Sequence, residues 1–286
     1  MILKDEKLYY VGGVVRDEVL GIESFDIDYC YEGNAIDFAR NLNVIKENPD
    51  FGTIRVIIDG EQIDIASTRT ESYPKKGHLP VINKIGCTLI EDMKRRDFTI
   101  NAMAKRTSDG EIFDYLGGMK DIEEKKLRVL HNGSFIDDPT RIIRGLKFAV
   151  RFGFELDEHT KNLQTDYLDN VNYDMSYHRL KKELVEAFSL NKQRVFEIFV
   201  KEKMYRLLGE NQPKIPSDIP FENLLSGYNG EYIWLIYLSF FDLSNLPLTK
   251  KEKNILEWAD KLKNNTSNNN TPKESILIHE MRCNYV

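Results

Sequence analysis

This chain of 286 residues lacks long apolar runs, clustered cysteines and an excess of positive charge. No apolar stretch approaches the roughly 20 residues that a membrane-spanning helix needs, and residues 1–6 do not form a signal peptide. The three cysteines are scattered, so they predict neither a disulfide framework nor a cysteine-ligated metal site. We therefore expect a cytoplasmic protein in a reducing environment, without a membrane partner.

The net charge of −6 argues against a protein that coats nucleic acid, because such binding depends largely on neutralising phosphates. A local basic groove remains compatible with this charge, since the basic residues are unevenly spread. They concentrate at residues 94–96, 141–151 and 181–182. The hydrophobic fraction of 41% and the charged fraction of 30% are typical of a globular protein. Composition alone leaves enzymes and binding proteins both open.

The order of patterns along the chain predicts an α+β fold. Strand patterns occupy residues 8–11, 26–31, 52–58 and 61–67. Asp59-Gly60 joins the last two as a hairpin turn. Helical patterns cover residues 14–20, 35–42, 89–103, 138–151, 157–169, 176–189, 192–208 and 250–263. Residues 71–87 are expected to form a loop, because prolines and glycines recur there.

Three parts are expected along the chain. A head of mixed strands and helices spans residues 1–128, and a helical neck spans 129–208. A helical C-terminal body spans 209–286 and begins with a proline-rich linker. The body also contains an asparagine-rich, low-complexity stretch at residues 264–271.

The Asp26-Ile27-Asp28 stretch is the main candidate for a chemical site. Two residues apart on a strand, both carboxylates lie on one face while Ile27 points to the other. Two acids this close repel each other unless a cation lies between them, which suits an Mg²⁺ site. Asp64 lies on a second strand with the same alternation and could supply a third oxygen ligand. By itself, such a pair is also typical of a solvated strand face.

A glycine pair precedes these acids at a predicted strand-to-helix turn. Gly12 and Gly13 would let backbone N–H groups approach a triphosphate, and the start of the helix would add partial positive charge. The alternative is an ordinary tight turn in which Arg16 and Asp17 form a local ion pair. The turn gains significance because it lies just before the acidic pair.

These residues resemble the first motif of class II CCA-adding tRNA nucleotidyltransferases, a family that includes bacterial poly(A) polymerases and belongs to the DNA polymerase β superfamily. Residues 64–73 are similar to the segment that follows the carboxylate strands of this family. Residues 91–104 match its second motif, and residues 137–144 resemble its nucleobase-reading motif. The resemblance covers roughly residues 8–155, about half of the chain.

The resemblance implies a polymerase β-like nucleotidyltransferase head with a small mixed sheet, followed by a helical neck and body. It implies an enzyme that adds C and/or A nucleotides from CTP and ATP to the 3′ end of tRNA without a template, releasing pyrophosphate. Asp26 and Asp28 would hold Mg²⁺, and Asp64 would be a third catalytic carboxylate. Gly12, Gly13 and Arg16 would contact the nucleotide.

The resemblance also assigns roles to the second motif. Arg95 and Arg96 would grip the triphosphate, Asp97 would sense a ribose hydroxyl, and Asn101 would be a further member of this site. Arginine suits phosphate because its planar fork donates two parallel hydrogen bonds. An exposed run of charges is the alternative reading of these residues.

In the helix at 138–151, Asp138 and Arg141 would bond the base edge, and Arg144 would face RNA or triphosphate. The alternative is that Asp138 only caps this helix, with Arg141 as its surface partner. The family often has Glu where this chain has Asp137, so the role of Asp137 is the least defined.

Several alternatives stay open at this point. The enzyme could add only CC or only the terminal A, or it could be a poly(A) polymerase. A protein of another class, a non-catalytic nucleotide sensor, could retain the fold. The loop at residues 71–87 could switch selection between C and A, as a comparable loop does in this family. The last 80 or so residues contain no pattern that we can place, and the sequence does not determine the oligomeric state.

Overall fold

The structure is a computed structural model that describes residues 3–24, 27–190, 193–213, 219–262 and 271–285. It divides into two compact units. The first comprises Met1–Asp137 and Glu155–Lys161, and the second comprises Asp138–Phe154 and Asn162–Val286. The domain boundaries that we expect at residues 128 and 208 stay predictions. Across the described ranges, no helix combines the length and apolarity that crossing a bilayer requires.

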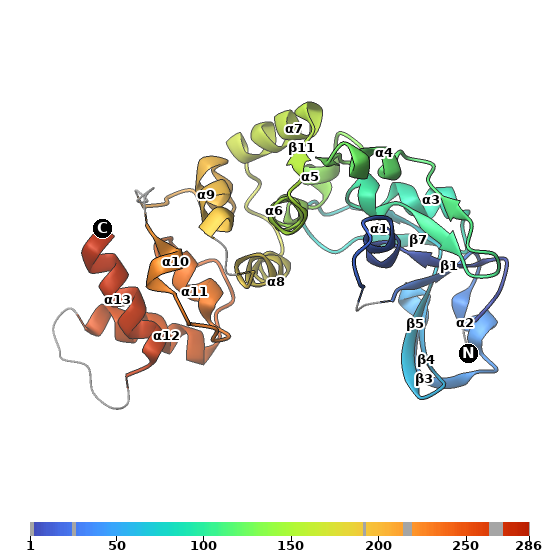
Figure 1. The fold of residues 1–286 in the computed structure, drawn as a ribbon, viewed down its shortest axis with the longest axis horizontal. Coiled ribbons are helices and arrows are strands. Elements are labelled where there is room, and N and C mark those ends of the chain that lie inside the picture. The colour runs from blue at the N-terminus through green and yellow to red at the C-terminus, as the bar shows by residue number, and fades with distance from the viewer. Residues whose placement is uncertain (1–2, 25–26, 191–192, 214–218, 263–270, 286) are drawn as a thin grey trace. The chain divides into compact units, whose positions relative to one another are not determined.

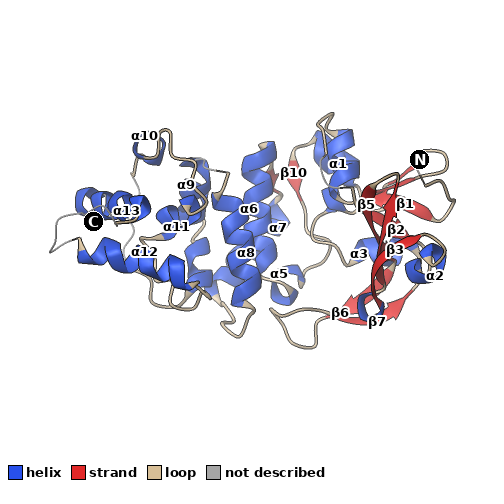
Figure 2. Ribbon diagram, turned by 90° about the horizontal axis from the view of Figure 1, so that it is seen from below, coloured by secondary structure: helices blue, strands red, loops and turns tan. Residues whose placement is uncertain are grey.

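A seven-stranded mixed sheet forms the centre of the first unit (Figures 1 and 2). Its strand order is β3-β4-β5-β2-β1-β8-β9. Strands β2 and β5 run parallel, whereas the other described neighbours are antiparallel. The strands are β1 Leu8–Val11, β2 Tyr29–Tyr31, β3 Asn43–Asn48, β4 Thr53–Ile58, β5 Glu61–Ser67, β8 Ala104–Arg106 and β9 Ile112–Phe113.

Alternating side chains of this sheet build two separate apolar layers. On one face, Ile54, Val56 and Ile65 pack against helix α2, Ala35–Ala39. On the other face, Val11 and Cys30 belong to a cluster that includes residues of helix α3, Leu89–Lys94. This division follows from the two-residue period of a strand, which sends successive side chains to opposite faces. Each face of the sheet therefore has its own covering helix.

The predicted hairpin at Asp59-Gly60 is confirmed. Asp59 and Gly60 have φ values of 52° and 86°, the left-handed values that a two-residue hairpin turn requires. The turn fixes the register of β4 and β5, so that Arg55 lies opposite Asp64. A local sequence signal thus sets a cross-strand contact that matters for the site.

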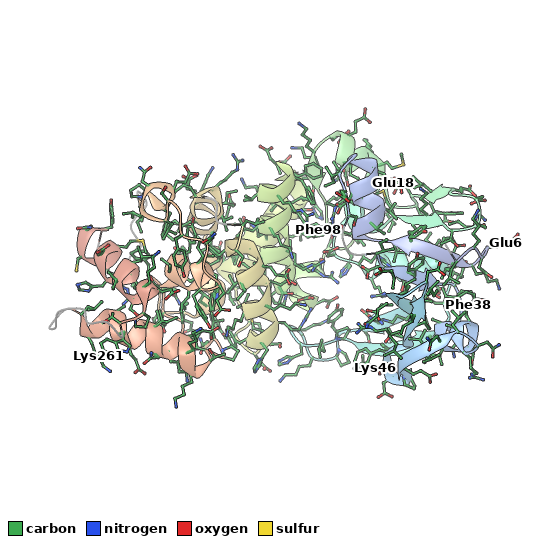
Figure 3. All side chains as sticks on the ribbon, turned by 60° about the horizontal axis from the view of Figure 1, so that its bottom comes forward. Glu6, Glu18, Phe38, Lys46, Phe98 and Lys261 are labelled. Atoms are coloured by element: carbon green, nitrogen blue, oxygen red, sulfur yellow. The ribbon has the colours of Figure 1, made fainter. Side chains whose placement is uncertain are left out.

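The boundaries of several other elements differ from expectation. The prediction of a loop at 71–87 is wrong in part, because β6 Arg69–Ser72 and β7 Val81–Ile85 form an antiparallel ribbon. The prolines and glycines lie mainly in the connection between them. The helix expected at 89–103 ends at Lys94. Three residues later, the side chain of Asp97 accepts a hydrogen bond from Phe98 N–H, and this local bond competes with helix formation. Phe98 itself is fully buried (Figure 3).

Two strand predictions also need correction. Strand β3 was not expected, since Asn43–Asn48 is polar and mostly exposed rather than clearly alternating. Strand β2 is shorter than the expected 26–31, and residues 25–26 lie outside the described part of the chain. The low-complexity stretch expected at 264–271 lies almost wholly outside it too.

The remaining elements of the first unit are short. They are α1 Gly13–Val19, α4 Gly118–Glu123, α5 Ser134–Asp137, and a two-stranded parallel pair of β10 Lys126–Leu127 and β11 Glu155–Leu156. Strand β11 comes after residue 129, so it is a small exception to the helical pattern expected there.

The second unit is built from helices (Figure 2). Phe196, Phe221 and Tyr237 pack ring against ring in its core, with Phe196–Phe221 centroids 4.7 Å apart and Phe221–Tyr237 centroids 4.3 Å apart. The helices are α6 Thr140–Phe152, α7 Glu158–Asp169 (shared with the first unit), α8 Tyr177–Phe188, α9 Gln193–Lys201, α10 Phe221–Leu224, α11 Ile233–Leu238, α12 Lys250–Lys261 and α13 Lys273–Tyr285. The expected α+β head with a helical body is confirmed.

The sheet core supplies a test of the first unit's packing. Replacing Ile65, whose side chain is fully buried, by Ala should lower the free energy of unfolding by about 2–5 kcal/mol, because it removes buried methyl groups and leaves a cavity. Ile45 of the same sheet is 46% exposed, so Ile45→Ala should cost less than about 1 kcal/mol. Urea unfolding followed by circular dichroism measures both, and equal losses would contradict this assignment of the core.

Candidate active site

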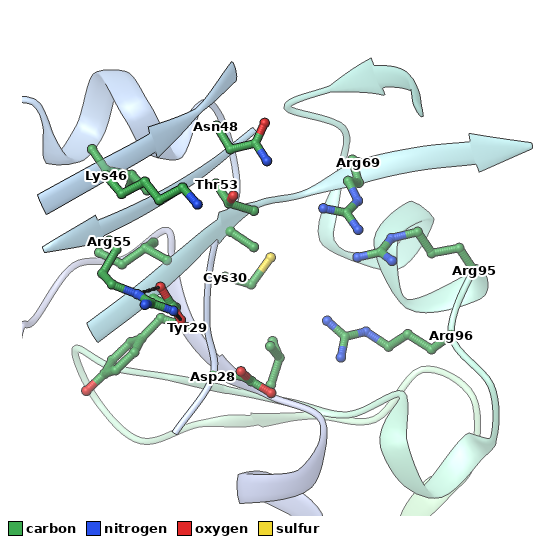
Figure 4. Close-up of a pocket in the computed structure, with 15 residues that line it drawn as sticks. Asp28, Tyr29, Cys30, Lys46, Asn48, Thr53, Arg55, Arg69, Arg95 and Arg96 are labelled. Carbon is green, nitrogen blue, oxygen red and sulfur yellow. Dashed lines mark hydrogen bonds and ion pairs between the residues drawn. The ribbon is translucent and has the colours of Figure 1, made fainter. Parts of the chain in front are cut away.

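A cleft of about 490 Å³ opens on the α3 face of the sheet in the first unit (Figure 4). Small side chains from four neighbouring strands line its base. The strand registers align Cys30 with Ala66, Ala66 with Thr53, and Thr53 with Asn48. Because these residues share one face, they form a continuous surface that leaves room for a ligand. We call this surface the floor.

A second set of residues, two positions along each strand from the floor, carries charge. Lys46 lies opposite Arg55, and Arg55 lies opposite Asp64. Continuing the register of β2 and β5 by one residue places Asp28 beside Asp64. All four residues line the cleft, and we call them the charged row. The row runs from two cations to two acids, across β3, β4 and β5 to the residue before β2.

Three arginines form the opposite side of the cleft (Figure 4). Arg69 begins β6, whereas Arg95 and Arg96 follow the end of α3. Glu71 accepts hydrogen bonds from Arg69 at 2.7 Å and from Arg95 at 3.1 Å. We call Arg69, Arg95 and Arg96 the arginine wall. Its guanidinium groups are held by other residues and present positive charge to the cleft.

Asp92 of α3 fixes two members of the arginine wall. Its carboxylate is fully buried and lies 2.8 Å from Arg95 and 3.0 Å from Arg96. It also accepts a hydrogen bond from the backbone N–H of Arg69 at 3.0 Å. Burial by itself would raise the pKa of Asp92, but the charges of Arg96 and Arg95 outweigh it and hold the pKa below its ordinary value. Asp92 is therefore a buried anion that orients cations.

The buried Nε of Arg96 has no hydrogen-bond partner among the described residues. A buried donor without an acceptor is costly, so native proteins usually satisfy it with protein, water or ligand. An anionic ligand in the cleft is one group that would supply the acceptor. Gly12 lies close by, since a Cβ at this position would approach Arg96 Nη1 to 3.1 Å.

The predicted glycine turn and part of the second motif meet in a buried network. Gly12 has φ +72° and ψ −123°, a conformation that side chains disfavour, and it precedes α1. Arg16 donates to Asp17 and to Asn101, both at 2.6 Å, and Asn101 donates to Asp97 at 3.0 Å. The local Arg16–Asp17 ion pair that we kept as an alternative is therefore present.

Arg16, Asp97 and Asn101 are nearly inaccessible in this structure. They do not line the cleft as described, whereas Arg95 and Arg96 do. The residues expected to contact the nucleotide therefore fall into two groups. Arg95 and Arg96 lie on the surface of the cleft, and Arg16, Asp97 and Asn101 form a buried network. Direct contact of the second group with a nucleotide stays a prediction.

The expected metal site is described only in part. Asp28 lines the cleft, but Asp26 lies outside the described residues. Among the described residues, no group of three His, Cys, Asp or Glu side chains is arranged to hold a metal ion. Mg²⁺ is commonly bound by one or two carboxylates together with substrate phosphates, and a cleft lined by both Asp28 and three arginines suits that mode of binding.

Asp64 has a partner that the sequence analysis did not anticipate. Arg55 donates one hydrogen bond to each carboxylate oxygen of Asp64, at 2.7 Å and 2.6 Å. These hydrogen bonds lower the pKa of Asp64. The position of Asp64 neighbours that of Asp28 in the charged row, but both oxygens of Asp64 are engaged by a guanidinium group.

The predicted base-reading residues lie in the second unit. Asp138 accepts hydrogen bonds from the backbone and hydroxyl of Thr140, at 3.2 Å and 2.6 Å, so it stabilises the start of α6. Its other oxygen pairs with Arg179 of α8. Arg141 is buried, which contradicts the alternative that made it a surface partner of Asp138. Arg179 is a neighbour of this cluster that sequence reasoning missed, since no local pattern connects it to Asp138.

Arg144 and Lys147 continue the polar side of α6. Arg144 pairs with Glu183 at 3.3 Å, and Lys147 pairs with Glu183 at 3.2 Å and with Glu186 at 2.5 Å. The acids of α8 thus balance much of the positive charge that the sequence shows here. A contact of Arg144 with RNA or triphosphate stays a prediction.

Comparison with known sequences identifies the head. A family model described as the poly A polymerase head domain matches residues 8–128. The A-adding tRNA nucleotidyltransferase of Aquifex aeolicus is 39% identical over 214 residues, which cover 71% of this chain and 25% of that protein. The corresponding enzyme of Geobacter sulfurreducens is 43% identical over 165 residues, 54% of this chain and 18% of that protein.

A CCA-adding enzyme from Bacillus pumilus is 32% identical over 209 residues, 70% of this chain and 50% of that protein. This chain therefore spans half or less of the length of these three relatives.

Solved structures resemble the whole chain. A CCA-adding enzyme in apo form II has a TM-score of 0.80 at 27% identity, covering 96% of this chain and 75% of that chain. A CCA-adding enzyme in complex with ATP has a TM-score of 0.76 at 25% identity, covering 96% and 73%. The Thermotoga maritima CCA-adding enzyme complexed with tRNA has a TM-score of 0.74 at 27% identity, covering 96% and 74%.

Asp92→Asn tests the role of this acid in fixing the arginine wall. The variant should lower the free energy of unfolding by about 3 kcal/mol at neutral pH, because it leaves cations without their buried partner. The pKa of Asp92 is lower in the folded state, so its contribution is complete above about pH 4 and is lost as pH falls through the folded-state pKa. The difference from wild type should therefore stay constant between roughly pH 5 and 8 and shrink in acid.

Urea unfolding at a series of pH values measures this difference. Asp37→Asn is the matched control, because Asp37 pairs with Arg40 at 2.6 Å but both side chains are exposed. Its effect should be within about 1 kcal/mol at every pH. A difference for Asp92→Asn that grows in acid would contradict the ionised state assigned to Asp92.

Proposed function

This chain belongs to the family of CCA-adding enzymes and poly(A) polymerases, and from this premise we propose that it adds C and/or A nucleotides to the 3′ end of tRNA. CTP and ATP are the proposed donors, and pyrophosphate is the second product. The addition would need no template and would build CCA or part of it. The cytoplasmic location stays a prediction.

One observation carries the proposal, namely that Asp28 and the arginine wall line the same cleft (Figure 4). A nucleoside triphosphate carries several negative charges on its phosphates, and guanidinium groups bind such oxygens in pairs. Because Asp92 and Glu71 already orient these guanidinium groups, little reorganisation is needed when phosphates bind. The cleft therefore suits a triphosphate with its reacting phosphorus near the acid.

Asp26 and Asp28 are the residues that would hold a divalent cation, which we propose to be Mg²⁺. A cation bound there would lower the pKa of the attacking RNA 3′-hydroxyl and neutralise charge on the departing pyrophosphate. The residues of this chain would hold the triphosphate in position for the reaction. The arginine wall would hold the β- and γ-phosphates, and Gly12 and Gly13 would leave space for backbone contact with them.

The remaining assignments are proposals of the same kind. Asp97 would contact a ribose hydroxyl, with Arg16 and Asn101 keeping its carboxylate oriented through the buried network. Asp138 and Arg141 of the second unit would select the base, since Asp accepts from an exocyclic amine and Arg donates to a ring acceptor. Cytosine and adenine both carry such an amine.

A narrower activity, addition of only the terminal A, is a second candidate. It is favoured by two A-adding relatives that are 39% and 43% identical to this chain, against 32% for the CCA-adding relative described above. The geometry of the cleft serves CTP and ATP alike, because the proposed phosphate contacts do not involve the base. The assay described next therefore distinguishes addition of CCA from addition of only the terminal A.

The function is tested with tRNA transcripts that end at the discriminator base, after C, and after CC. Each is incubated with Mg²⁺ and CTP, ATP or both nucleotides, and the ends are sequenced while pyrophosphate release is measured. CCA addition extends all three transcripts when both nucleotides are present. Addition of A alone extends only the transcript ending in CC, and only with ATP. Nucleotide binding without pyrophosphate release on any transcript would indicate a sensor and would overturn the proposal.

Asp28→Asn should abolish nucleotide addition while leaving the fold intact. Loss of one metal-binding carboxylate removes several kcal/mol of transition-state stabilisation, which corresponds to a decrease in kcat of about a thousandfold or more. Single-turnover incorporation of labelled nucleotide measures the loss, and circular dichroism checks the fold. Asp37→Asn, on the opposite side of the sheet, should retain wild-type turnover. Substantial turnover by the Asp28 variant would contradict the role of Asp28.

A further inference from the structure

Two cations in the cleft are not used by the proposed triphosphate site. Lys46 of β3 and Arg55 of β4 lie in neighbouring positions of the charged row and both line the cleft. Figure 4 shows them across the cleft from the arginine wall, with Asp28 at the cleft's edge between the two sides. A ligand that binds these two cations would therefore lie on the side of the cleft opposite the arginine wall, where the triphosphate is proposed to bind.

The ion pair of Arg55 with Asp64 does little for stability. Its side chains are 45% and 56% exposed, and exposed pairs of this kind contribute between about 0 and 1 kcal/mol. Its geometry is nevertheless well defined, because the guanidinium donates to both carboxylate oxygens. Such bidentate pairing fixes the plane and direction of an arginine. The pair is therefore better suited to orienting Arg55 than to holding the sheet together.

We propose that Lys46 and Arg55 bind the phosphodiester backbone of the acceptor RNA strand, and that Asp64 is the positioning residue for Arg55. This inference rests on the proposed function, in which that strand carries the attacking 3′-hydroxyl. In the charged row, Asp28 would then face the reaction, Asp64 would orient Arg55, and Lys46 and Arg55 would hold the RNA.

The direction of attack places the RNA on this side. In phosphoryl transfer the attacking oxygen and the leaving group lie roughly in line on opposite sides of the phosphorus. If the arginine wall holds the β- and γ-phosphates of the leaving pyrophosphate, the strand that supplies the 3′-hydroxyl must enter from the opposite side. Lys46 and Arg55 are the cations that the cleft offers there.

The chemistry of these residues favours a backbone over a base. Lysine and arginine donate hydrogen bonds and carry charge, and phosphate contacts of this kind position a nucleic acid without reading its sequence. The neighbouring floor residues are small, and Tyr29, the aromatic residue that lines this side among the described residues, is only 7% exposed because it packs in the apolar cluster on the α2 face, so little ring surface is available for base stacking. Recognition independent of sequence suits an enzyme that would extend RNA ends of differing terminal base.

The proposal changes the part assigned to Asp64. A third metal ligand would direct at least one oxygen to the cation, whereas both oxygens of Asp64 bond to Arg55 here. As a positioning residue, Asp64 acts on the reaction only through the arginine. The two roles predict different results when Asp64 and Arg55 are replaced together.

The experiment compares Lys46→Ala, Arg55→Ala, Asp64→Asn and the double variant Arg55→Ala/Asp64→Asn with wild type. Binding of fluorescein-labelled tRNA transcript is measured by anisotropy without metal, at several salt concentrations. Steady-state assays then give kcat and the KM for RNA and for nucleotide. Arg40→Ala is the matched control, since Arg40 directly follows α2, forms an exposed pair with Asp37 at 2.6 Å and does not line the cleft. Thermal melting confirms that every variant is folded.

Lys46→Ala and Arg55→Ala should each weaken RNA binding and raise the KM for RNA about tenfold, the effect of losing one charged contact. The slope of binding against salt should fall by about one unit for each contact removed. The kcat and the KM for nucleotide should stay within about twofold of wild type. Asp64→Asn should act in the same direction but less strongly, and the double variant should be no worse than Arg55→Ala.

Other outcomes overturn the inference. A raised KM for nucleotide with unchanged RNA binding would assign Lys46 and Arg55 to the triphosphate. A large loss of kcat in Asp64→Asn, with unchanged RNA binding and a greater requirement for metal, would make Asp64 a metal ligand. Failure of the proposed function looks different, because wild type itself would then add no nucleotide. The anisotropy measurement would still report in that case whether these residues bind RNA.

Discussion

The buried carboxylate of Asp92 is the contact on which the candidate site depends. It forms ion pairs with Arg95 and Arg96 and accepts a hydrogen bond from the backbone N–H of Arg69, so this one acid connects the end of α3 to the start of β6. Without it, like-charged guanidinium groups would repel each other and spread into solvent. With it, the arginine wall keeps one direction and faces the cleft. A site for a polyanion needs cations that are oriented before the ligand arrives, and this acid provides that orientation.

The sheet contributes the other half of the site through strand geometry. Alternation sends apolar side chains of β4 and β5 to the α2 face, and it sends Thr53, Arg55 and Asp64 to the cleft. The same period that builds the core therefore builds the floor and the charged row. Opposite charges meet in that row, which lets Asp64 direct Arg55. The family to which the chain belongs explains why a nucleotide and an RNA end are the proposed occupants.

Particular residues show how far sequence patterns reach. The Gly12-Gly13 turn, the Asp59-Gly60 hairpin and the hydrogen bond from Thr140 N–H to Asp138 at the start of α6 depend on neighbours in the chain, so local signals predict them well. The hairpin turn also implies that Arg55 lies opposite Asp64, a consequence that could have been read from the sequence. Strand β3 and Lys46 escaped notice because an exposed edge strand has no apolar alternation to reveal it.

By itself, the sequence determined the family motifs, the α+β class and the acids and arginines of the head, because these depend on residue type and spacing. Only the tertiary structure decided which charges meet. It buried Arg16 and Asn101 in one network and joined Asp138 to Arg179, residues separated by 41 positions. Such pairings depend on strand order, register and helix packing, which bring distant parts of the chain together. A spacing pattern contains no information about them.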